Sequence, residues 1–258
     1  MSPIRLDIDG HAYTADPARP ASLAIPLLFN GPQPGFFAAP AASGEAFEST
    51  EFHGHTRTGG SCNVASLHLT PHCNGTHTEC VGHVTDDGVA VTDQLPGGWF
   101  PATLVTLEPR HDVLDAALVE AGLQRYPVSG MHAAFILRTL PNGSDKLSRN
   151  YSLVPAPHIA ETAIKVLVAA GVQHLLVDLP SLDPVHDHGR LAAHRGFWGL
   201  PAGSRRRADA RRPQATVTEL IYVPNAIPDG YYLLDLQIPA FMSDAAPSRP
   251  IVYPLEPT

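Results

Sequence analysis

The sequence predicts a single α/β domain in which a layer of strands and helices packs against further strands. Strand-like and helix-like segments alternate between residues 102 and 179, which is typical of a sheet covered by helices. The strand-like segments on either side of this region have no helix between them and predict a second β layer. The 26 prolines and 21 glycines among the 258 residues favour many turns over long helices. The chain has no internal repeat and no linker long enough to divide it.

The expected strands follow from hydrophobic patterning. The first 60 residues are rich in proline, alanine and glycine, and we expect an irregular covering segment around a short strand at 24–28. Residues 64–70 alternate, with Leu67 and Leu69 on one side and polar side chains on the other, which predicts a strand. Further strands, rich in Val, Ile, Leu or Tyr, are expected at 102–107, 133–137, 174–179, 216–223 and 231–238.

Two helices are expected between these strands. Residues 112–123 place valine and alanine at helical spacing, with Asp112 as the predicted N-cap. Residues 158–170 repeat the pattern, and we expect the helix to stop at Gly171. Both helices are short, and both lie within the alternating region that predicts the α/β layer.

Charge and composition exclude several classes of protein. With 17 basic and 25 acidic residues the net charge is −8, which repels phosphates and excludes a nucleic-acid-binding role. No apolar run approaches the roughly 20 residues that a membrane span requires. The acidic N-terminus and the odd number of cysteines, three, predict a cytoplasmic protein without a disulfide framework. The basic segment 201–213 is interpreted as a solvated loop insert, with a patch for an anionic substrate or partner as the alternative.

Histidine and cysteine are concentrated in one segment, HCNGTHTECVGH, which begins at His72. It holds five of the 17 His and Cys residues, where even spacing would place fewer than one. Imidazole, thiolate and carboxylate groups bind transition metals. In an extended backbone His77 and Glu79 project to one face, and a bend at Gly75 brings His72 or Cys73 to the same point. The segment predicts a metal site with open coordination positions; structural histidines in a polar loop, or a structural metal site, are the alternatives.

The same segment resembles the signature H-x-G-T-H-x-D-x-P-x-H of the cyclase family of metal-dependent hydrolases, which includes bacterial kynurenine formamidases and isatin hydrolases. Downstream segments occur in the family's order, so that the resemblance covers about residues 20–255. These segments are DLPSLDP at 178–184, HR at 194–195, TEL at 218–220 and PDG at 228–230. The resemblance implies a swivelling β/β/α fold with mixed sheets and a few packed helices, assembled as a homodimer or homotetramer.

The resemblance also implies roles for individual residues. His77 and Glu79 match the family's second metal histidine and its metal aspartate. His83 matches the histidine that transfers protons in the family. His194 and Glu219 correspond to a distant histidine and glutamate that complete the site, either by bridging to a second metal or by orienting the water.

The chain departs from the family signature at three positions. Glu79 replaces the aspartate with a side chain one methylene longer, and Val81 replaces the proline. Ungapped alignment puts Cys73 at the first metal histidine, whereas a one-residue bulge restores His72, which we favour. A Cys73 ligand would favour Zn²⁺, whereas a site of His and Glu alone suits Zn²⁺ or Mn²⁺ equally.

Together with the metal-binding segment, the resemblance implies a metal-dependent hydrolase that cleaves a C–N bond in an amide, formamide or cyclic amide of a small-molecule substrate. Motifs of serine hydrolases, nucleotide-binding loops and H-E-x-x-H proteases are absent from the sequence, so amide hydrolysis would rely on the metal. Phe197 and Trp198 are expected in the core or in the wall of an aromatic substrate pocket. Two alternatives remain: a metal-dependent lyase or dehydratase, and a non-catalytic metal- or small-molecule-binding protein.

Overall fold

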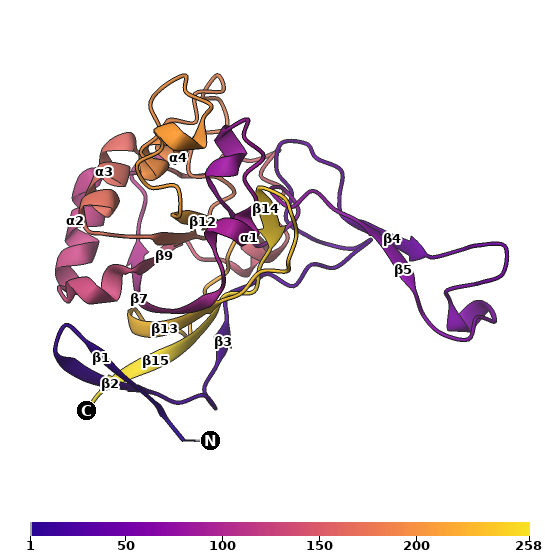
Figure 1. Cartoon of the computed structure of the whole chain (residues 1–258), viewed down its shortest axis with the longest axis horizontal. Coiled ribbons are helices and arrows are strands. Elements are labelled where there is room, and N and C mark those ends of the chain that lie inside the picture. Colours follow the sequence, from indigo (N-terminus) through magenta and orange to yellow (C-terminus); the bar gives the residue numbers. More distant parts are fainter. Residues whose placement is uncertain (1) are drawn as a thin grey trace.

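The computed structural model describes residues 2–258 and places most strands in one 11-stranded sheet (Figure 1). These strands are β1 (Ile4–Ile8), β2 (His11–Ala15), β3 (Ala21–Ser22), β6 (His77–Glu79), β7 (Gly98–Leu107), β9 (Ala134–Thr139), β11 (His174–Val177), β12 (Thr216–Glu219), β13 (Gly230–Leu236), β14 (Ala245–Pro247) and β15 (Ile251–Pro257). Their order across the sheet is β1-β2-β15-β13-β7-β9-β11-β12-β6-β14, and β3 pairs with β15. The central strands β7, β9, β11 and β12 are parallel, and their neighbours on both sides are antiparallel.

The α/β class is confirmed, but the predicted second β layer is not a separate sheet. Strand β13 continues the central sheet by pairing with β7, from Gly230 opposite Leu104 to Leu236 opposite Gly98. The five strands expected in this part of the chain all form, with ends that differ by a few residues. Sequence periodicity identifies strands, but it does not say which edges pair.

Three helices pack in a row against the central strands, α2 against α3 and α3 against α4 (Figure 1). The α-helices are α1 (Val91–Gln94), α2 (Ala116–Arg125), α3 (Glu161–Ala169) and α4 (Ala192–Trp198). The 3-10 helices are η1 (Thr56–Thr58), η2 (Val81–Val84), η3 (Ser129–His132), η4 (Ser144–Leu147) and η5 (Arg207–Asp209). No helix within residues 2–258 has both the length and the apolar character needed to cross a bilayer.

Both predicted helices form, but each begins later than expected. Helix α2 is capped by Asp115, whose carboxylate accepts a hydrogen bond from the Leu118 N–H at 2.9 Å. Asp112, the predicted cap, instead has a left-handed backbone with φ 61° and precedes the short strand β8 (Val113–Leu114). Strand β10 (His158–Ile159) pairs with β8 and occupies the first residues of the other predicted helix. Gly171, with φ 84°, follows the end of that helix as predicted.

The central strands are buried on both faces. Val105 and Leu107 of β7 point toward the helices, while Ala102 and Leu104 belong to a second apolar cluster on the other face of the sheet. Phe197 and Trp198 of α4 are completely buried in the helix-side cluster. They are therefore core residues, and the alternative that they line a substrate pocket is wrong.

The N-terminal segment differs from the expected irregular cover. Strands β1 and β2 form a hairpin that adds to the sheet through β15, and the strand expected at 24–28 is reduced to a single bridge between Ala24 and Ile221. Strands β4 (Ser43–Ala46) and β5 (Ala65–His68) form a hairpin arm that projects from the body of the molecule (Figure 1). On this arm Leu67 is 53% exposed, so the alternation at 64–70 does not mark a half-buried strand.

Candidate metal centre

The floor of the site is one face of the antiparallel strands β6 and β12. Glu219 lies opposite His77, and Val217 lies opposite Glu79. Because side chains alternate along a strand, these four side chains share the face on which Val217 packs in the helix-side cluster. His77, Glu79 and Glu219 are buried there, with at most 5% of any of these side chains exposed.

His194 reaches this floor from helix α4. Asp183 accepts hydrogen bonds from the backbone N–H groups of Ala193 and His194 at 2.7 and 3.1 Å, and from His194 Nδ1 at 2.6 Å. His194 Nε2 therefore faces the sheet, 2.9 Å from Glu79 Oε1 and 3.2 Å from Glu219 Oε1. Asp183 was not predicted as a site residue, although it lies within the DLPSLDP segment that resembles the family.

A hydrogen bond also orients His77. Its Nδ1 donates to the carbonyl oxygen of Gly75 at 2.9 Å, which requires the proton to be on Nδ1. The other nitrogen, Nε2, faces Glu219 Oε2 at 3.5 Å. Fixing one ring nitrogen by a hydrogen bond and presenting the other is typical of metal-binding histidines.

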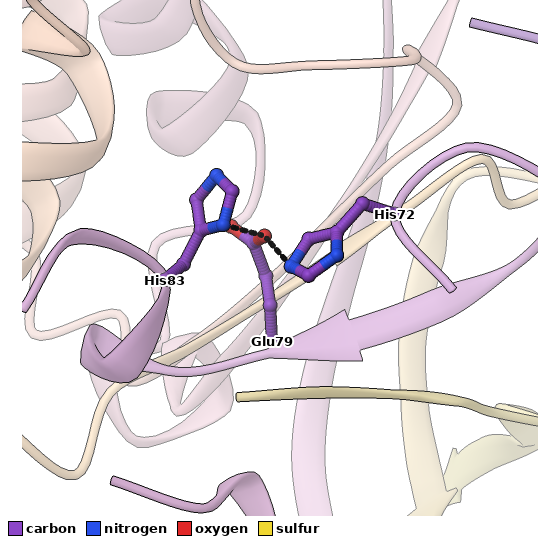
Figure 2. A group of neighbouring side chains, drawn as sticks. All are labelled: His72, Glu79 and His83. Atoms are coloured by element: carbon purple, nitrogen blue, oxygen red, sulfur yellow. Dashed lines mark ion pairs between the residues drawn. The ribbon is translucent and has the colours of Figure 1, made fainter. Parts of the chain in front are cut away.

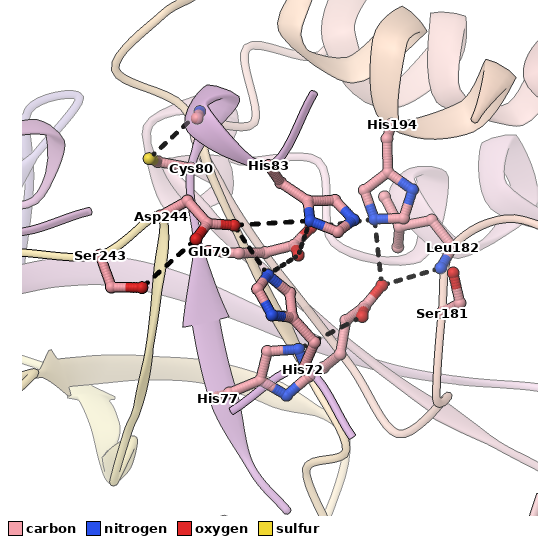
Figure 3. A network of polar contacts seen from close by, with 12 residues as sticks. His72, His77, Glu79, Cys80, His83, Ser181, Leu182, His194, Ser243 and Asp244 are labelled. Atoms are coloured by element: carbon pink, nitrogen blue, oxygen red, sulfur yellow. Dashed lines mark hydrogen bonds and ion pairs between the residues drawn. The ribbon is translucent and has the colours of Figure 1, made fainter. Parts of the chain in front are cut away.

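The rim of the site is formed by His72 and His83, which lie on either side of Glu79 (Figure 2). Both side chains are about one quarter exposed. His72 Nε2 lies 3.6 Å from Glu79 Oε2, and His83 Nδ1 lies 3.8 Å from the same oxygen. The two rings stack with centroids 4.5 Å apart and an interplanar angle of 28°. Asp244, which was not predicted from the sequence, immediately precedes β14 and faces both rings (Figure 3).

The structure brings His72, and not Cys73, to the site. A turn follows Thr70, whose N–H donates to Asn74 Oδ1 at 2.6 Å, and the backbone bends at Gly75 with φ 157°. Cys73 is buried in an apolar cluster and belongs to neither group of possible metal-binding side chains. The other core members of that cluster are Ile25, Phe36, Tyr151 and Leu220. Burial raises the pKa of the Cys73 thiol, which disfavours the thiolate that binds metals.

Five buried side-chain atoms at the centre have no hydrogen-bond partner among the described residues. They are His72 Nε2, His77 Nε2, His194 Nε2, Glu79 Oε1 and Glu79 Oε2. Although several lie within ion-pair distance of one another, none of these contacts has hydrogen-bond geometry. Buried polar atoms are normally paired. Imidazole nitrogens and carboxylate oxygens that converge without pairing fit a divalent cation.

Two overlapping sets of side chains could hold such a cation. One comprises His72, Glu79 and His83, and the other comprises His77, Glu79 and Glu219; within each set the ligand atoms lie within 4.8 Å of one another. Glu79 belongs to both sets. Its two oxygens face different histidines, Oε2 toward the rim and Oε1 toward His194.

The electrostatics of the floor favour positive charge. Burial raises the pKa of Glu219, but its close polar contacts with His194 and His77 outweigh this and lower it to about 2. Burial lowers the pKa of His194, but Glu79, Asp183 and Glu219 outweigh this and raise it well above its ordinary value. Carboxylates that remain ionised around an imidazole stabilise a cation at this position, whether a proton or a metal ion.

The basic segment 201–213 lies outside the metal centre. A cavity of about 620 Å³ is lined in part by Arg190, Arg195 and Arg205, and none of the residues of the metal centre lines it. Arg195 and His194 are neighbours on α4, but the Arg195 guanidinium donates to the Ser204 carbonyl at 2.7 Å. Segment 201–213 is thus a loop with one 3-10 turn, as predicted, and its arginines take no part in the centre.

Comparison with known proteins agrees with this architecture. The chain is 24% identical over 199 residues to a kynurenine formamidase of Bacillus mycoides (strain KBAB4), a match that covers 76% of this chain and 82% of the relative. Among solved structures, isatin hydrolase A from Ralstonia solanacearum superposes with a TM-score of 0.61 at 13% identity, covering 92% of this chain and 91% of that one. A "predicted metal-dependent hydrolase" from Bacillus stearothermophilus gives a TM-score of 0.57 at 12% identity, covering 91% and 98%.

The two structural likenesses establish a shared fold. The family itself follows from the sequence, because the model of the Cyclase family, described as "Putative cyclase", matches residues 15–184. This match spans well over half of the chain and includes the whole HCNGTHTECVGH segment. The chain therefore belongs to the Cyclase family.

Proposed function

We propose that the protein is a metal-dependent hydrolase that cleaves a C–N bond in an amide, formamide or cyclic amide. The observation that carries the proposal is the convergence of unpaired buried imidazole and carboxylate atoms around Glu79. The relatives support the reaction class, since the kynurenine formamidase and isatin hydrolase names both describe hydrolysis of such a bond.

A bound divalent cation would supply a Lewis acid, which lowers the pKa of bound water to about 7 and polarises a carbonyl group. His72, His77 and Glu79 are the residues that we propose to hold it. His194 and Glu219 complete the floor, where Asp183 and the Leu182 N–H keep them in place. Imidazole and carboxylate groups without a thiolate suit Zn²⁺ or Mn²⁺.

His83 is proposed to accept the proton of the attacking water and later to deliver it to the departing nitrogen. It lies on the partly exposed rim, where a small-molecule substrate can reach it, and its Nδ1 is 3.8 Å from Glu79 Oε2. General acid–base catalysis of this kind contributes about 10²- to 10⁴-fold to a rate.

The proposal is tested first by the metal content of the purified protein. We expect close to stoichiometric Zn²⁺ or Mn²⁺ by elemental analysis, and loss of the metal in His77→Ala, because that variant removes a buried imidazole of the floor. His11→Ala, which changes an exposed histidine of strand β2, serves as the matched control and should keep the metal. A wild-type protein free of metal would contradict the assignment.

The reaction class is tested with formamides of aromatic amines in ¹⁸O-labelled water. Hydrolysis places one solvent oxygen in the new carboxylic acid, and mass spectrometry of the product detects it. A lyase or dehydratase need not incorporate that oxygen. Turnover without ¹⁸O in an acid product would therefore favour the lyase.

We also propose that the protein is a cytoplasmic homodimer or homotetramer. Its three cysteines are free thiols, which fits a reducing compartment. The projecting arm carries large apolar side chains that are 41 to 53% exposed, namely Phe47, Val64 and Leu67. Exposed apolar groups gathered on one segment are typical of an interaction surface.

The assembly is tested by light scattering after size-exclusion chromatography. We expect the mass of a dimer or tetramer for the wild type and a shift toward the monomer for the double variant Phe47→Ser, Leu67→Ser. A wild-type protein that elutes as a monomer at micromolar concentration would contradict this proposal.

A further inference from the structure

Asp244 faces the same imidazole nitrogens as Glu79. Its Oδ2 lies 3.0 Å from His72 Nε2 and 3.6 Å from His83 Nδ1. Glu79 Oε2 lies 3.6 and 3.8 Å from these same two nitrogens. The two histidines and the two carboxylates thus alternate around the rim, as Figure 3 shows.

The backbone holds Asp244 in this position. Strand β14 pairs with β6, with Ala245 opposite Glu79, and the Cys80 N–H donates to the Asp244 carbonyl at 3.0 Å. Gly82 permits the close approach, because a Cβ at this residue would lie 3.0 Å from the Asp244 Cβ and 2.2 Å from the Val89 carbonyl oxygen. Asp244 is therefore placed by the sheet and not by a mobile surface loop.

The contact between His72 and Asp244 is not a satisfied hydrogen bond. His72 Nε2 is buried and has no hydrogen-bond partner among the residues described, although Asp244 Oδ2 is only 3.0 Å away. Both carboxylates approach the nitrogen that a metal would use. A carboxylate that merely orients a ligand histidine normally binds the opposite ring nitrogen, as Asp183 does with His194.

We propose that Asp244 is a further metal ligand, which binds the cation held at the rim by His72 and Glu79. The separations of His72 Nε2 from Asp244 Oδ2 and from Glu79 Oε2, 3.0 and 3.6 Å, fit this role. Atoms bound to one Zn²⁺ at about 2.0 to 2.2 Å in a tetrahedral arrangement are themselves separated by roughly 3.4 Å. This inference rests on the proposed function. It adds to the proposed ligands a carboxylate that lies more than 160 residues after Glu79 in the chain.

The first test measures Zn²⁺ binding to the metal-free protein by calorimetry. We expect Asp244→Asn to weaken Zn²⁺ binding by more than about 100-fold, beyond the 10- to 100-fold loss typical of an orienting residue. Asp93→Asn, which removes an exposed carboxylate of the neighbouring helix α1, is the matched control and should bind as the wild type does. Equal affinity in Asp244→Asn and the wild type would overturn the proposal.

The second test places a different ligand at the same position. In the Co²⁺-loaded protein, Asp244→Cys should produce a thiolate-to-Co²⁺ charge-transfer band that is absent from the wild type and from Asp93→Cys. A Co²⁺-loaded, folded Asp244→Cys protein without this band would show that the side chain does not contact the ion, and would overturn the proposal. A wild type that binds neither Zn²⁺ nor Co²⁺ would instead overturn the proposed function, and the Asp244 assignment with it.

Discussion

His83 is the side chain whose proposed role differs most from those of its neighbours. Its Nδ1 belongs to a ligand-like set with His72 and Glu79, yet the family resemblance implies proton transfer. Metal content and rate distinguish the two roles, because a ligand affects both and a proton-transfer residue affects only the rate.

We expect His83→Ala to lose about 10²- to 10⁴-fold in kcat on a substrate identified as above, because it removes the acid–base group. Elemental analysis of the same preparation should show wild-type metal content. If the variant keeps full turnover, proton transfer must be assigned to another residue. If it loses the metal, His83 is a ligand.

The choice between His72 and Cys73 shows which features of the site can be predicted from residue type and which cannot. The concentration of His, Cys and Glu in one segment is a property of composition, so the sequence indicates a metal site without any structure. Which of two adjacent residues faces the site depends on one turn, set by the Asn74 side chain and the bend at Gly75.

Helix α2 shows how an element can be predicted while its beginning is wrong. Both Asp112 and Asp115 are acceptable N-caps by residue type, and local spacing does not separate them. The pairing of β8 with β10 holds residues 113–114 extended, and this long-range contact moves the start of the helix to Ala116.

We expect Asp115→Ala to lower the free energy of unfolding by about 1 kcal/mol, within the usual range of 0.5 to 2 for the loss of a cap. The physical reason is the loss of the hydrogen bond that its carboxylate accepts from the Leu118 N–H. Denaturation by urea measures the change. Asp112→Asn is the control, since it keeps a residue that tolerates the left-handed backbone, and a larger loss there would contradict the observed helix start.

For the molecule as a whole, His174 links stability to pH at a distance from the metal centre. It lies buried at the start of β11, with Nδ1 2.8 Å from the Thr216 hydroxyl and its ring 4.1 Å from that of Phe100. Burial, with a smaller contribution from Arg212, lowers its pKa to about 4. The unfolded chain has a histidine pKa of about 6.5.

Between these two pKa values the unfolded chain binds a proton at His174 more readily than the folded protein does. The contribution of the neutral His174 to the free energy of unfolding is therefore fully present above about pH 6.5 and is lost as the pH decreases toward 4. The loss from this group is on the order of 3 kcal/mol. Unfolding by urea at several pH values measures it, and His174→Gln should remove this part of the pH dependence. An identical pH dependence in both proteins would contradict the buried neutral histidine.

Much of the architecture could be predicted from patterns that lie close together in the chain. The alternation of strands and helices between residues 102 and 179, the strands that flank it and the metal-binding segment at His72 are all local features. Hydrophobic periodicity and residue type report which side of an element is buried and which chemistry a segment can perform. The motif that begins at His72, together with the downstream segments, carried the family resemblance, which the Cyclase family match confirms.

The other features of the fold and of the site depend on contacts between distant parts of the chain. The joining of β13 to β7, the projecting arm, and the approach of Asp183 and Asp244 to histidines far away in sequence depend on strand pairing and packing. These contacts have no local pattern, because a strand edge can pair with many others and only the combined burial of the whole molecule selects one. Composition therefore indicated a metal centre, and the folded sheet selected the side chains that surround it.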